Sequence, residues 1–263
     1  MKANESTMKI EMKKSIGKII LFIAFEFGID ANIIALLLLG LKLPPVTHLM
    51  VYKVATVVTV LVLNHVIIHQ KFAFKRLSKL GSTALILLLA LDAFVGLKSP
   101  RFLGAALAVG LFAAVPEELM YRGVFLGVLY DSYQERSGHQ WQRLVPLILS
   151  AAIFGLAHLI NLRTQGFLPT MMQVMQTAGL GLVLGAAYLR TQNLILPVAM
   201  HFSLDFLVTL RSGYATSQNA HPSLMGTLTI FAIYAFISWL ILLHQPAPDK
   251  FASLAHNHRL ARH

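Results

Sequence analysis

The sequence contains no cysteine, and this absence removes several kinds of chemistry. A disulfide framework, a thiolate metal site and a cysteine nucleophile all need residues that the chain does not have. Two common hydrolase signatures are also missing, the H-E-x-x-H pattern of zinc peptidases and the G-x-S-x-G elbow of serine hydrolases. These absences argue against the ordinary metalloprotease and serine-hydrolase routes.

Charged residues are scarce as well. They make up 13% of the chain, against roughly 25% in soluble domains. Hydrophobic residues make up 56%, and the mean hydropathy is +0.67. A soluble domain of 263 residues could not bury so much apolar surface. The composition therefore predicts an integral membrane protein.

The formal net charge of +11 does not indicate nucleic-acid binding. The lysines and arginines form short clusters between apolar runs, which is typical of topology signals and of contacts with anionic lipid headgroups. We therefore expect membrane lipid, and not nucleic acid, as the partner of these clusters.

Eight apolar runs approach or exceed the length of about 20 residues that a membrane-spanning helix needs. No repeat of fixed period and no separate soluble segment interrupts them. The sequence thus predicts an all-α bundle of about eight transmembrane helices, formed by one polytopic domain over residues 1–263. The runs cover residues 16–41, 48–68, 82–97, 102–130, 144–162, 167–189, 194–210 and 224–243.

Basic residues predict the orientation of the bundle. They concentrate in the N-terminal arm 1–15, in the loop HQKFAFKRLSKLG after the second run, and in the tail 245–263. Short loops rich in lysine and arginine stay in the cytoplasm. We therefore expect a multi-pass protein of the cell membrane with both termini cytoplasmic. No short apolar region followed by a cleavage site is present, so we expect the first helix to be retained.

Three charged residues lie close together in the fourth run, within the segment FAAVPEELMYRGVFLG, residues 112–127. An ionisable residue inside a spanning helix costs about 2.5–3.5 kcal/mol and is a candidate functional residue. The i, i+4 spacing puts Glu118 and Arg122 on one helical face, where they can pair. Glu117 is turned about 100° from Glu118, so we expect it to point elsewhere in the bundle as an available carboxylate.

Two further segments place polar residues inside apolar runs. In AAIFGLAHLI, His158 follows Phe154 at i+4, and in LPVAMHFSLDFL, Asp205 follows His201 at i+4. Each residue alone has a structural explanation, such as a hydrogen bond between two helices. Their occurrence on three different runs together with Glu117 favours one shared site.

Other acidic residues in the runs have no second motif beside them. Glu26 and Asp30 are expected near a helix end or paired with basic residues, and Asp92 is a further exception.

A site of this composition allows two schemes of hydrolysis. A buried carboxylate with a histidine can orient and deprotonate water, while a second histidine donates hydrogen bonds to the oxyanion. Alternatively, Glu117, His158, His201 and Asp205 could hold a divalent metal such as Zn²⁺, whose bound water is the nucleophile. The residues alone do not choose between the two.

Three motifs resemble those of the CPBP family, the CAAX-protease and bacteriocin-processing (Abi) intramembrane proteases. PEELMYRG is similar to the E-E-x-x-x-R motif, FGLAH to F-x-x-x-H, and HFSLD to H-x-x-x-N/D. They occur in the family's order on the fourth, fifth and seventh of eight runs, within residues 101–210.

The resemblance implies a role for each matching residue. Glu117 would activate water with His158, while His201 and Asp205 would stabilise the oxyanion. Glu118, Arg122 and Phe154 would support the site. Prenyl-protein proteases of the family have Asn at the position of Asp205, and an ionised aspartate would repel an oxyanion.

The resemblance implies an intramembrane endopeptidase that cuts a membrane-associated protein or peptide. We favour bacteriocin processing or self-immunity over cleavage of a prenylated C-terminus. A non-catalytic immunity or scaffold protein, or a small transporter, is the alternative. A transporter would show inverted repeats and broken helices in matched positions, and neither is evident here.

Overall fold

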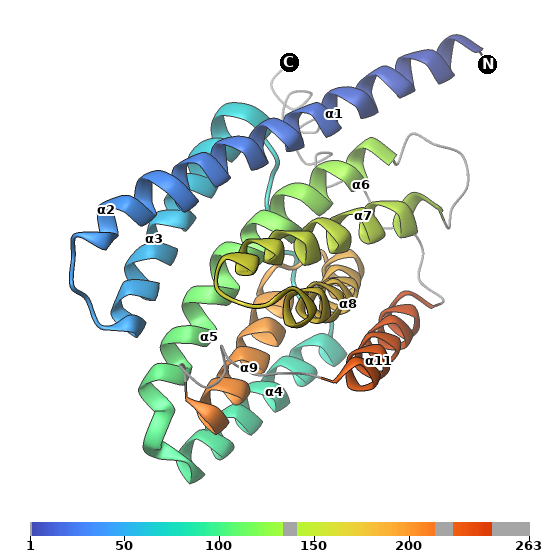
Figure 1. Cartoon of the computed structure of the whole chain (residues 1–263). Coiled ribbons are helices and arrows are strands. Elements are labelled where there is room, and N and C mark those ends of the chain that lie inside the picture. The colour runs from blue at the N-terminus through green and yellow to red at the C-terminus, as the bar shows by residue number, and fades with distance from the viewer. Residues whose placement is uncertain (1, 134–140, 214–222, 244–263) are drawn as a thin grey trace, which may run out of the picture.

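The computed structural model describes residues 2–133, 141–213 and 223–243, and nearly all of them lie in helices (Figure 1). Eight helices of this part are long and apolar enough to cross a membrane, which confirms the predicted all-α bundle. They run Lys13–Leu39, Pro45–Ile68, Lys79–Lys98, Pro100–Tyr133, Arg143–Arg163, Phe167–Thr191, Ile195–Ser212 and Leu224–Leu242. The tail 245–263, expected in the cytoplasm, lies outside the described residues.

Several spans are built from more than one helical segment. In chain order the elements are α1 (Lys2–Gly28), η1 (Ile29–Ile34), α2 (Ala35–Leu39), α3 (Pro45–Leu63), η2 (Asn64–Ile68), α4 (Lys79–Lys98), η3 (Pro100–Phe102), α5 (Leu103–Glu118), η4 (Leu119–Leu126), α6 (Gly127–Tyr133), α7 (Trp141–Ala157), η5 (His158–Arg163), α8 (Phe167–Thr191), α9 (Ile195–Ser212) and α11 (Leu224–Leu242).

The fourth span widens into a π-helix directly after the two glutamates. Pro116 lies inside α5, and the π-helical segment η4 begins at Leu119. Proline has no N–H and its ring displaces the carbonyl four residues earlier, so a regular helix is disturbed there. Such π-helical turns often occur at functional sites, because they change the direction of the side chains that follow. The local sequence thus favours irregular geometry beside Glu117 and Glu118.

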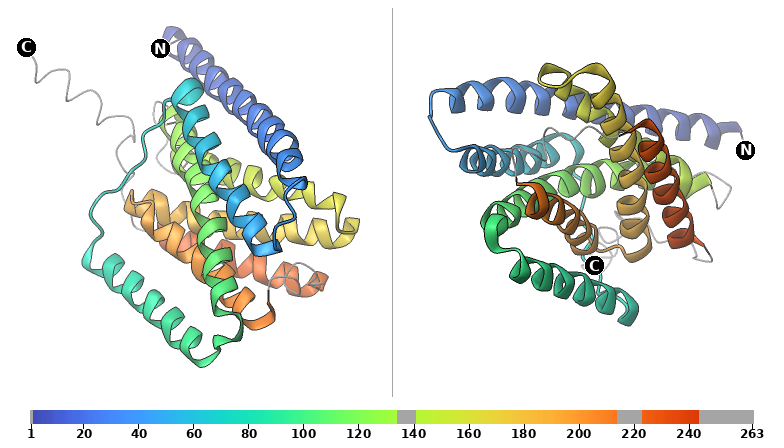
Figure 2. Two further views of the ribbon diagram at one scale, coloured as in Figure 1. Left: turned by 90° about the vertical axis from the view of Figure 1, so that its left-hand side faces the viewer. Right: turned by 60° about the horizontal axis from the view of Figure 1, so that its bottom comes forward.

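The fourth span runs through the middle of the bundle (Figure 1). The helices α3 and α9 pack against α5, and α1 packs against α6 and α3. On the other side α7 packs against η4 and α8. The helix α4 lies outside α9, and α11 lies outside α8 (Figure 2). The first motif spans the end of α5 and η4, the second spans the end of α7 and the start of η5, and the third lies on α9.

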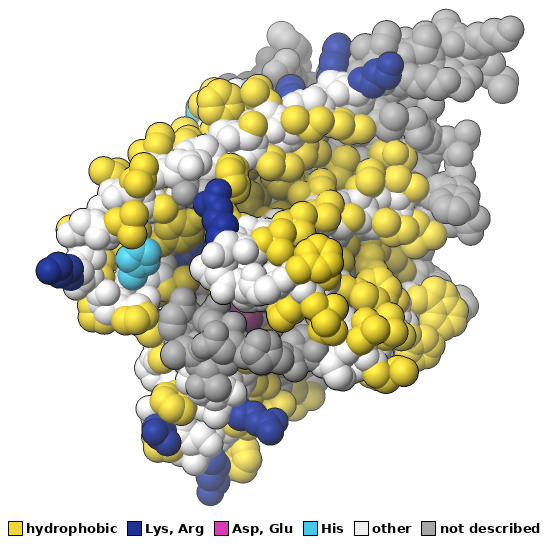
Figure 3. All heavy atoms as spheres, viewed as in Figure 1, with side chains coloured by type: hydrophobic (Ala, Val, Ile, Leu, Met, Phe, Trp, Pro, Cys, Tyr) yellow, Lys and Arg dark blue, Asp and Glu magenta, His cyan; other side chains and the backbone are white. Residues whose placement is uncertain are grey.

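Hydrophobic side chains cover much of the outer surface (Figure 3). Leu37, Leu97 and Met225 are among the many large apolar residues that are exposed, while Glu118 and Arg122 are fully buried. This distribution is the reverse of that in a soluble protein. It fits a bundle whose outer face contacts lipid and whose polar groups pair internally.

Glycines allow the motif-bearing helices to approach closely. A Cβ atom at Gly110 on α5 would lie 2.9 Å from the backbone oxygen of Phe202 on α9. A Cβ atom at Gly155 on α7 would lie 2.7 Å from the backbone oxygen of Val174 on α8. Small residues at such crossings let two backbones touch, as is usual in membrane bundles. Because Phe202 follows His201, the first contact also sets the height of His201 beside α5.

The basic loop after the second span is tied to the rest of the bundle. Phe74 forms an isolated antiparallel bridge with Asn193, between α8 and α9. Asn193 Nδ2 donates to the Lys75 carbonyl oxygen at 2.6 Å, and Ala73 N–H donates to the hydroxyl of Tyr188 at 3.2 Å. The loop therefore fastens the α8–α9 connection and so supports the start of α9.

Candidate active site

Glu118 joins Arg122 and His201 in a buried cluster. Its Oε1 accepts a hydrogen bond from Arg122 Nη1 at 2.7 Å and another from His201 Nδ1 at 2.8 Å. Glu118 is 0% exposed and Arg122 is 1% exposed. The charge of this carboxylate is thus balanced within the protein, which offsets the desolvation cost of its burial. Glu118 fixes the orientation of the His201 ring and directs Nε2 away from itself.

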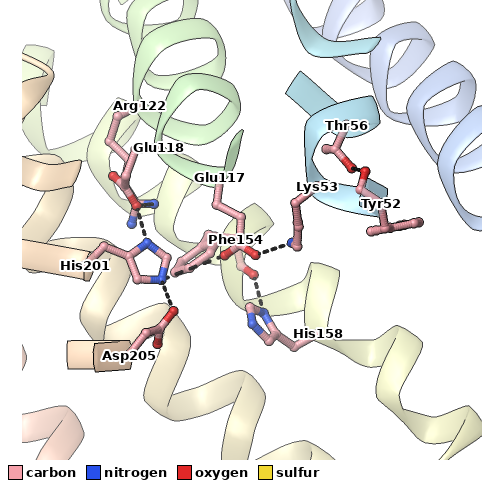
Figure 4. Close-up of polar contacts among 10 residues, drawn as sticks. All are labelled: Tyr52, Lys53, Thr56, Glu117, Glu118, Arg122, Phe154, His158, His201 and Asp205. Carbon is pink, nitrogen blue, oxygen red and sulfur yellow. Dashed lines mark hydrogen bonds and ion pairs between the residues drawn. The ribbon is translucent and has the colours of Figure 1, made fainter. Parts of the chain in front are cut away.

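The Nε2 atom of His201 faces two other carboxylates. It lies 3.5 Å from Asp205 Oδ2 on the next turn of α9 and 3.9 Å from Glu117 Oε2 on α5. The i, i+4 spacing of His201 and Asp205 therefore places both residues toward Glu117 (Figure 4).

Glu117 has a partner that the sequence did not predict. Its Oε1 accepts a hydrogen bond from Lys53 Nζ on α3 at 2.7 Å. The two side chains are 19% and 17% exposed, so this pair is not sealed inside the bundle. Glu117 points away from Glu118, as expected, but only one of its oxygens is available, because α3 packs against α5 and brings a lysine to the other.

His158 approaches Glu117 from the end of α7. Its Nδ1 lies 3.0 Å from the carbonyl oxygen of Phe154. A carbonyl oxygen only accepts hydrogen bonds, so Nδ1 carries the hydrogen and Nε2 remains for another partner. The ring points toward the Glu117 carboxylate (Figure 4). The helix tightens from an α-helix to the 3-10 segment η5 at His158.

Phe154 packs between Arg122 and the two histidines. Its ring centroid is 4.4 Å from the guanidinium carbon of Arg122, 5.3 Å from the ring of His158 and 5.9 Å from the ring of His201. Both histidine contacts are edge-to-face, which is a favourable aromatic geometry. The cation–π contact adds to the stabilisation of Arg122. Phe154 thus holds three side chains of the cluster in fixed relative positions.

The structure brings the sequence-predicted residues together. Glu117, His158, His201 and Asp205 converge on one region between α5, α7 and α9, with Glu118, Arg122 and Phe154 packed beside them (Figure 4). Their catalytic roles stay predictions. Lys53 was missed, although a lysine inside the second apolar run was a signal of the kind that singled out the glutamates.

The remaining intramembrane acids differ from expectation in part. Asp30 is 1% exposed inside the first span, and it interacts with Lys53 on α3, as the alternative of pairing with a basic residue predicted. It is not at the end of the span, because the helix continues through η1 into α2. Asp92 on α4 accepts a short hydrogen bond from Ser203 Oγ on α9.

The side chains of the cluster do not form a metal site in this arrangement. In the described part of the chain, no three histidine, aspartate or glutamate side chains are placed to hold a metal ion together. The two nitrogens of His201 face Glu118 and Asp205, and an ammonium group occupies Oε1 of Glu117. These donors serve one another, so the geometry does not fit a resident cation.

Comparison with known proteins finds a family similar to the middle part of the chain. Residues 99–207 match the family model described as type II CAAX prenyl endopeptidase, Rce1-like. The matched stretch holds all three motifs, so the resemblance inferred from them is confirmed. Lys53 lies outside the matched residues. No curated protein and no solved structure matches the chain.

Proposed function

We propose that this membrane protein, whose residues 99–207 match a CAAX prenyl endopeptidase family model, cuts peptide bonds with a water molecule activated by Glu117 and His158. The observation that carries the proposal is the arrangement around Glu117. Its carboxylate is partly exposed in an otherwise apolar bundle and faces histidines from two other helices. A base, a water-orienting group and an oxyanion donor are the three parts that hydrolysis of an amide needs.

In the first step water attacks the carbonyl carbon of the scissile bond. Glu117 accepts the proton from this water through Oε2, because Lys53 occupies Oε1. His158 Nε2 accepts a hydrogen bond from the second hydrogen of the water, since Nδ1–H is donated to Phe154. The two groups together fix the direction of attack and the transfer of one proton.

His201 is suited to stabilise the oxyanion that forms. Its Nδ1–H donates to Glu118. A second proton on Nε2 then makes the ring an imidazolium that can donate to the oxyanion. That imidazolium carries its charge next to three carboxylates, those of Glu117, Glu118 and Asp205. A preorganised donor in a site of low dielectric stabilises the developing negative charge strongly.

The reaction finishes when the tetrahedral intermediate collapses. The C–N bond breaks, and the proton that Glu117 took from water passes to the leaving nitrogen. Glu117 is then a carboxylate again, and the products are a free amine and a carboxylic acid. No group outside the protein and water is required.

We infer that the substrate is a peptide or membrane-protein segment that reaches the site from the lipid phase or its surface. The outer face of the bundle is apolar and the site lies among its helices. A cell-membrane location with cytoplasmic termini belongs to this proposal. Bacteriocin leader peptides and lipidated C-terminal peptides are the two substrate classes to be compared.

Alanine variants test the proposal. Glu117→Ala and His158→Ala should abolish cleavage of a peptide that the unaltered protein cuts, while both proteins still accumulate in the membrane. Cleavage is followed by mass spectrometry of the peptide products, and accumulation by immunoblotting. Full activity in both variants would show that the peptidase assignment is wrong.

A chelator distinguishes the two hydrolytic schemes. Activity that survives a strong chelator, with no metal found by elemental analysis, is the result expected for the glutamate–water scheme. Loss of activity that is regained on adding one divalent metal would instead support a metal-bound water.

A further inference from the structure

Lys53 contacts Glu117 directly but takes no proton and touches no substrate in the proposed reaction steps. Its Nζ lies 2.7 Å from Glu117 Oε1, which is a charge-assisted hydrogen bond. The residue comes from α3, outside residues 99–207 that match the family model. The contact is therefore a feature of this chain that the three motifs do not contain.

The face of α3 on which Lys53 lies is turned into the bundle. Lys53, Thr56 and Val60 are spaced i, i+3 and i+7 and so share one helical face, and Thr56 and Val60 are buried. Packing of α3 on α5 carries this face to Glu117. The position of the ammonium group is thus set by the packing of two helices.

Two acidic groups of the first span also lie within electrostatic reach of Lys53. Glu26 and Asp30 are i and i+4 on one face of that span, and both interact electrostatically with Lys53. Asp30 is buried beside Thr56 and Thr59 of α3. Lys53 therefore has acidic neighbours on the first span and on α5, and its direct hydrogen bond goes to Glu117.

The contact distinguishes the two oxygens of Glu117. Oε1 is bound to the ammonium group, whereas Oε2 lies 3.9 Å from His201 Nε2 on the side of the histidines. A carboxylate held by one oxygen cannot rotate freely about its last bond. Only the second oxygen is then directed toward His201 (Figure 4).

We propose that Lys53 is a positioning residue for the catalytic carboxylate, which holds Oε1 so that Oε2 faces the water between His158 and His201. The inference rests on the proposed function, because it takes Glu117 as the group that activates water. It gives Lys53 no contact with the substrate. It predicts that loss of the ammonium group slows the chemical step and leaves substrate binding nearly unchanged.

The absence of cysteine allows a direct test. In Lys53→Cys the introduced thiol is the only one in the protein. Alkylation with 2-bromoethylamine attaches an ammonium group at nearly the reach of lysine, and alkylation with 2-bromoethanol attaches a neutral group of similar size. Mass spectrometry verifies each modification, and cleavage kinetics are measured with the purified full-length protein before and after.

We expect Lys53→Cys to lower kcat by about 10²-fold, since a misplaced catalytic group costs a factor of this order. KM should change by less than about threefold, because uniform binding is not affected. Aminoethylation should restore most of kcat, and hydroxyethylation should not. The control Lys42→Cys, at an exposed lysine of the first loop, should keep its kcat with either reagent.

A second pair of variants avoids chemical modification. Lys53→Arg should retain most of kcat, and Lys53→Met should lose it. An unchanged kcat in Lys53→Met, or equal recovery of Lys53→Cys with both reagents, would overturn the role of Lys53. If Lys53→Met keeps its kcat while Glu117→Gln is inactive in the same assay, the role of Lys53 is wrong and the proposed function stands. Full activity of Glu117→Gln would contradict the proposed function itself.

Discussion

At the scale of residues, two adjacent glutamates have quite different surroundings. Glu118 is fully buried between Arg122 and His201, whereas Glu117 is partly exposed beside Lys53 and the histidines. The difference follows from the turn of about 100° between successive helical residues. Removing either partner of a buried ion pair leaves an uncompensated charge, so Glu118 and Arg122 depend on each other.

Asp205 offers a prediction at the same scale. Asp205→Asn should keep kcat within about tenfold, because the amide can still contact His201 and can donate an N–H to the oxyanion. Asp205→Leu has a similar size and no polar atom. It should lower kcat by about 10²–10³-fold, the usual effect of losing one group that organises an oxyanion site. Initial rates of peptide cleavage measure both variants.

The pair of variants separates charge from hydrogen bonding. If Asp205→Asn lost as much activity as Asp205→Leu, the negative charge of Asp205 would be required and its role would lie in stabilising the His201 imidazolium. Thermal unfolding of both purified variants serves as the control for damage to the fold.

Some residues of the site were predictable from the sequence and others were not. Spacing predicted the pair of Glu118 and Arg122, because i, i+4 contacts are local. The hydrogen bond of Lys53 to Glu117 joins residues 64 positions apart, and the sequence carries no information on which helix packs against α5. A lysine within an apolar run indicates a buried partner but does not identify it.

At the scale of elements, close helix crossings position the site. Gly110 and Phe202 meet where α5 crosses α9, next to the segment that carries His201. A Cβ atom added at Gly110 would lie 2.9 Å from the backbone oxygen of Phe202. This oxygen belongs to the backbone of α9, so it can move away only if α9 moves. The distance of His201 from the glutamates therefore depends on a glycine about two turns before them.

Gly110→Ala should consequently reduce both stability and activity. Overpacking of a close contact costs about 1–3 kcal/mol, and a displaced α9 carries His201 with it. Gly104→Ala on the same helix is the matched control, since nothing lies within 4 Å of a Cβ there. The midpoint of thermal unfolding in detergent and the cleavage rate are measured for both. Equal behaviour of the two variants would contradict the role given to this crossing.

The sequence predicted the spans well and their irregular parts poorly. Apolar runs give a strong signal for helices, and seven of the eight spans extend beyond the predicted runs at one or both ends. The π-helical segments η1, η2 and η4 leave the hydrophobic pattern nearly unchanged. Only Pro116 marks the disturbance before η4, because the loss of one backbone donor can be read from residue type.

At the scale of the whole molecule, the charge distribution predicts the topology. The loop after the second span carries Lys71, Lys75, Arg76 and Lys79, and the first loop carries a single basic residue, Lys42. The positive-inside rule places the former in the cytoplasm and the latter outside. Side-chain contacts within the bundle cannot decide this, since they are the same in either orientation.

Single cysteines can locate the two loops, because the protein has no other thiol. Lys42→Cys and Arg76→Cys introduce exposed positions on opposite sides. A membrane-impermeant maleimide added to intact cells should label Lys42→Cys alone, and both variants should react after the cells are opened. Labelling of Arg76→Cys in intact cells would reverse the predicted orientation.

The central claim is that Glu117 activates water for cleavage of a peptide bond inside the membrane. Its most direct test is the cleavage of candidate leader and lipidated peptides by purified protein in liposomes prepared in ¹⁸O-water. The unaltered protein should release a fragment with ¹⁸O in its new carboxylate, and Glu117→Gln, which keeps the size of the side chain, should release none. Labelled product formed by Glu117→Gln at the rate of the unaltered protein would contradict the account.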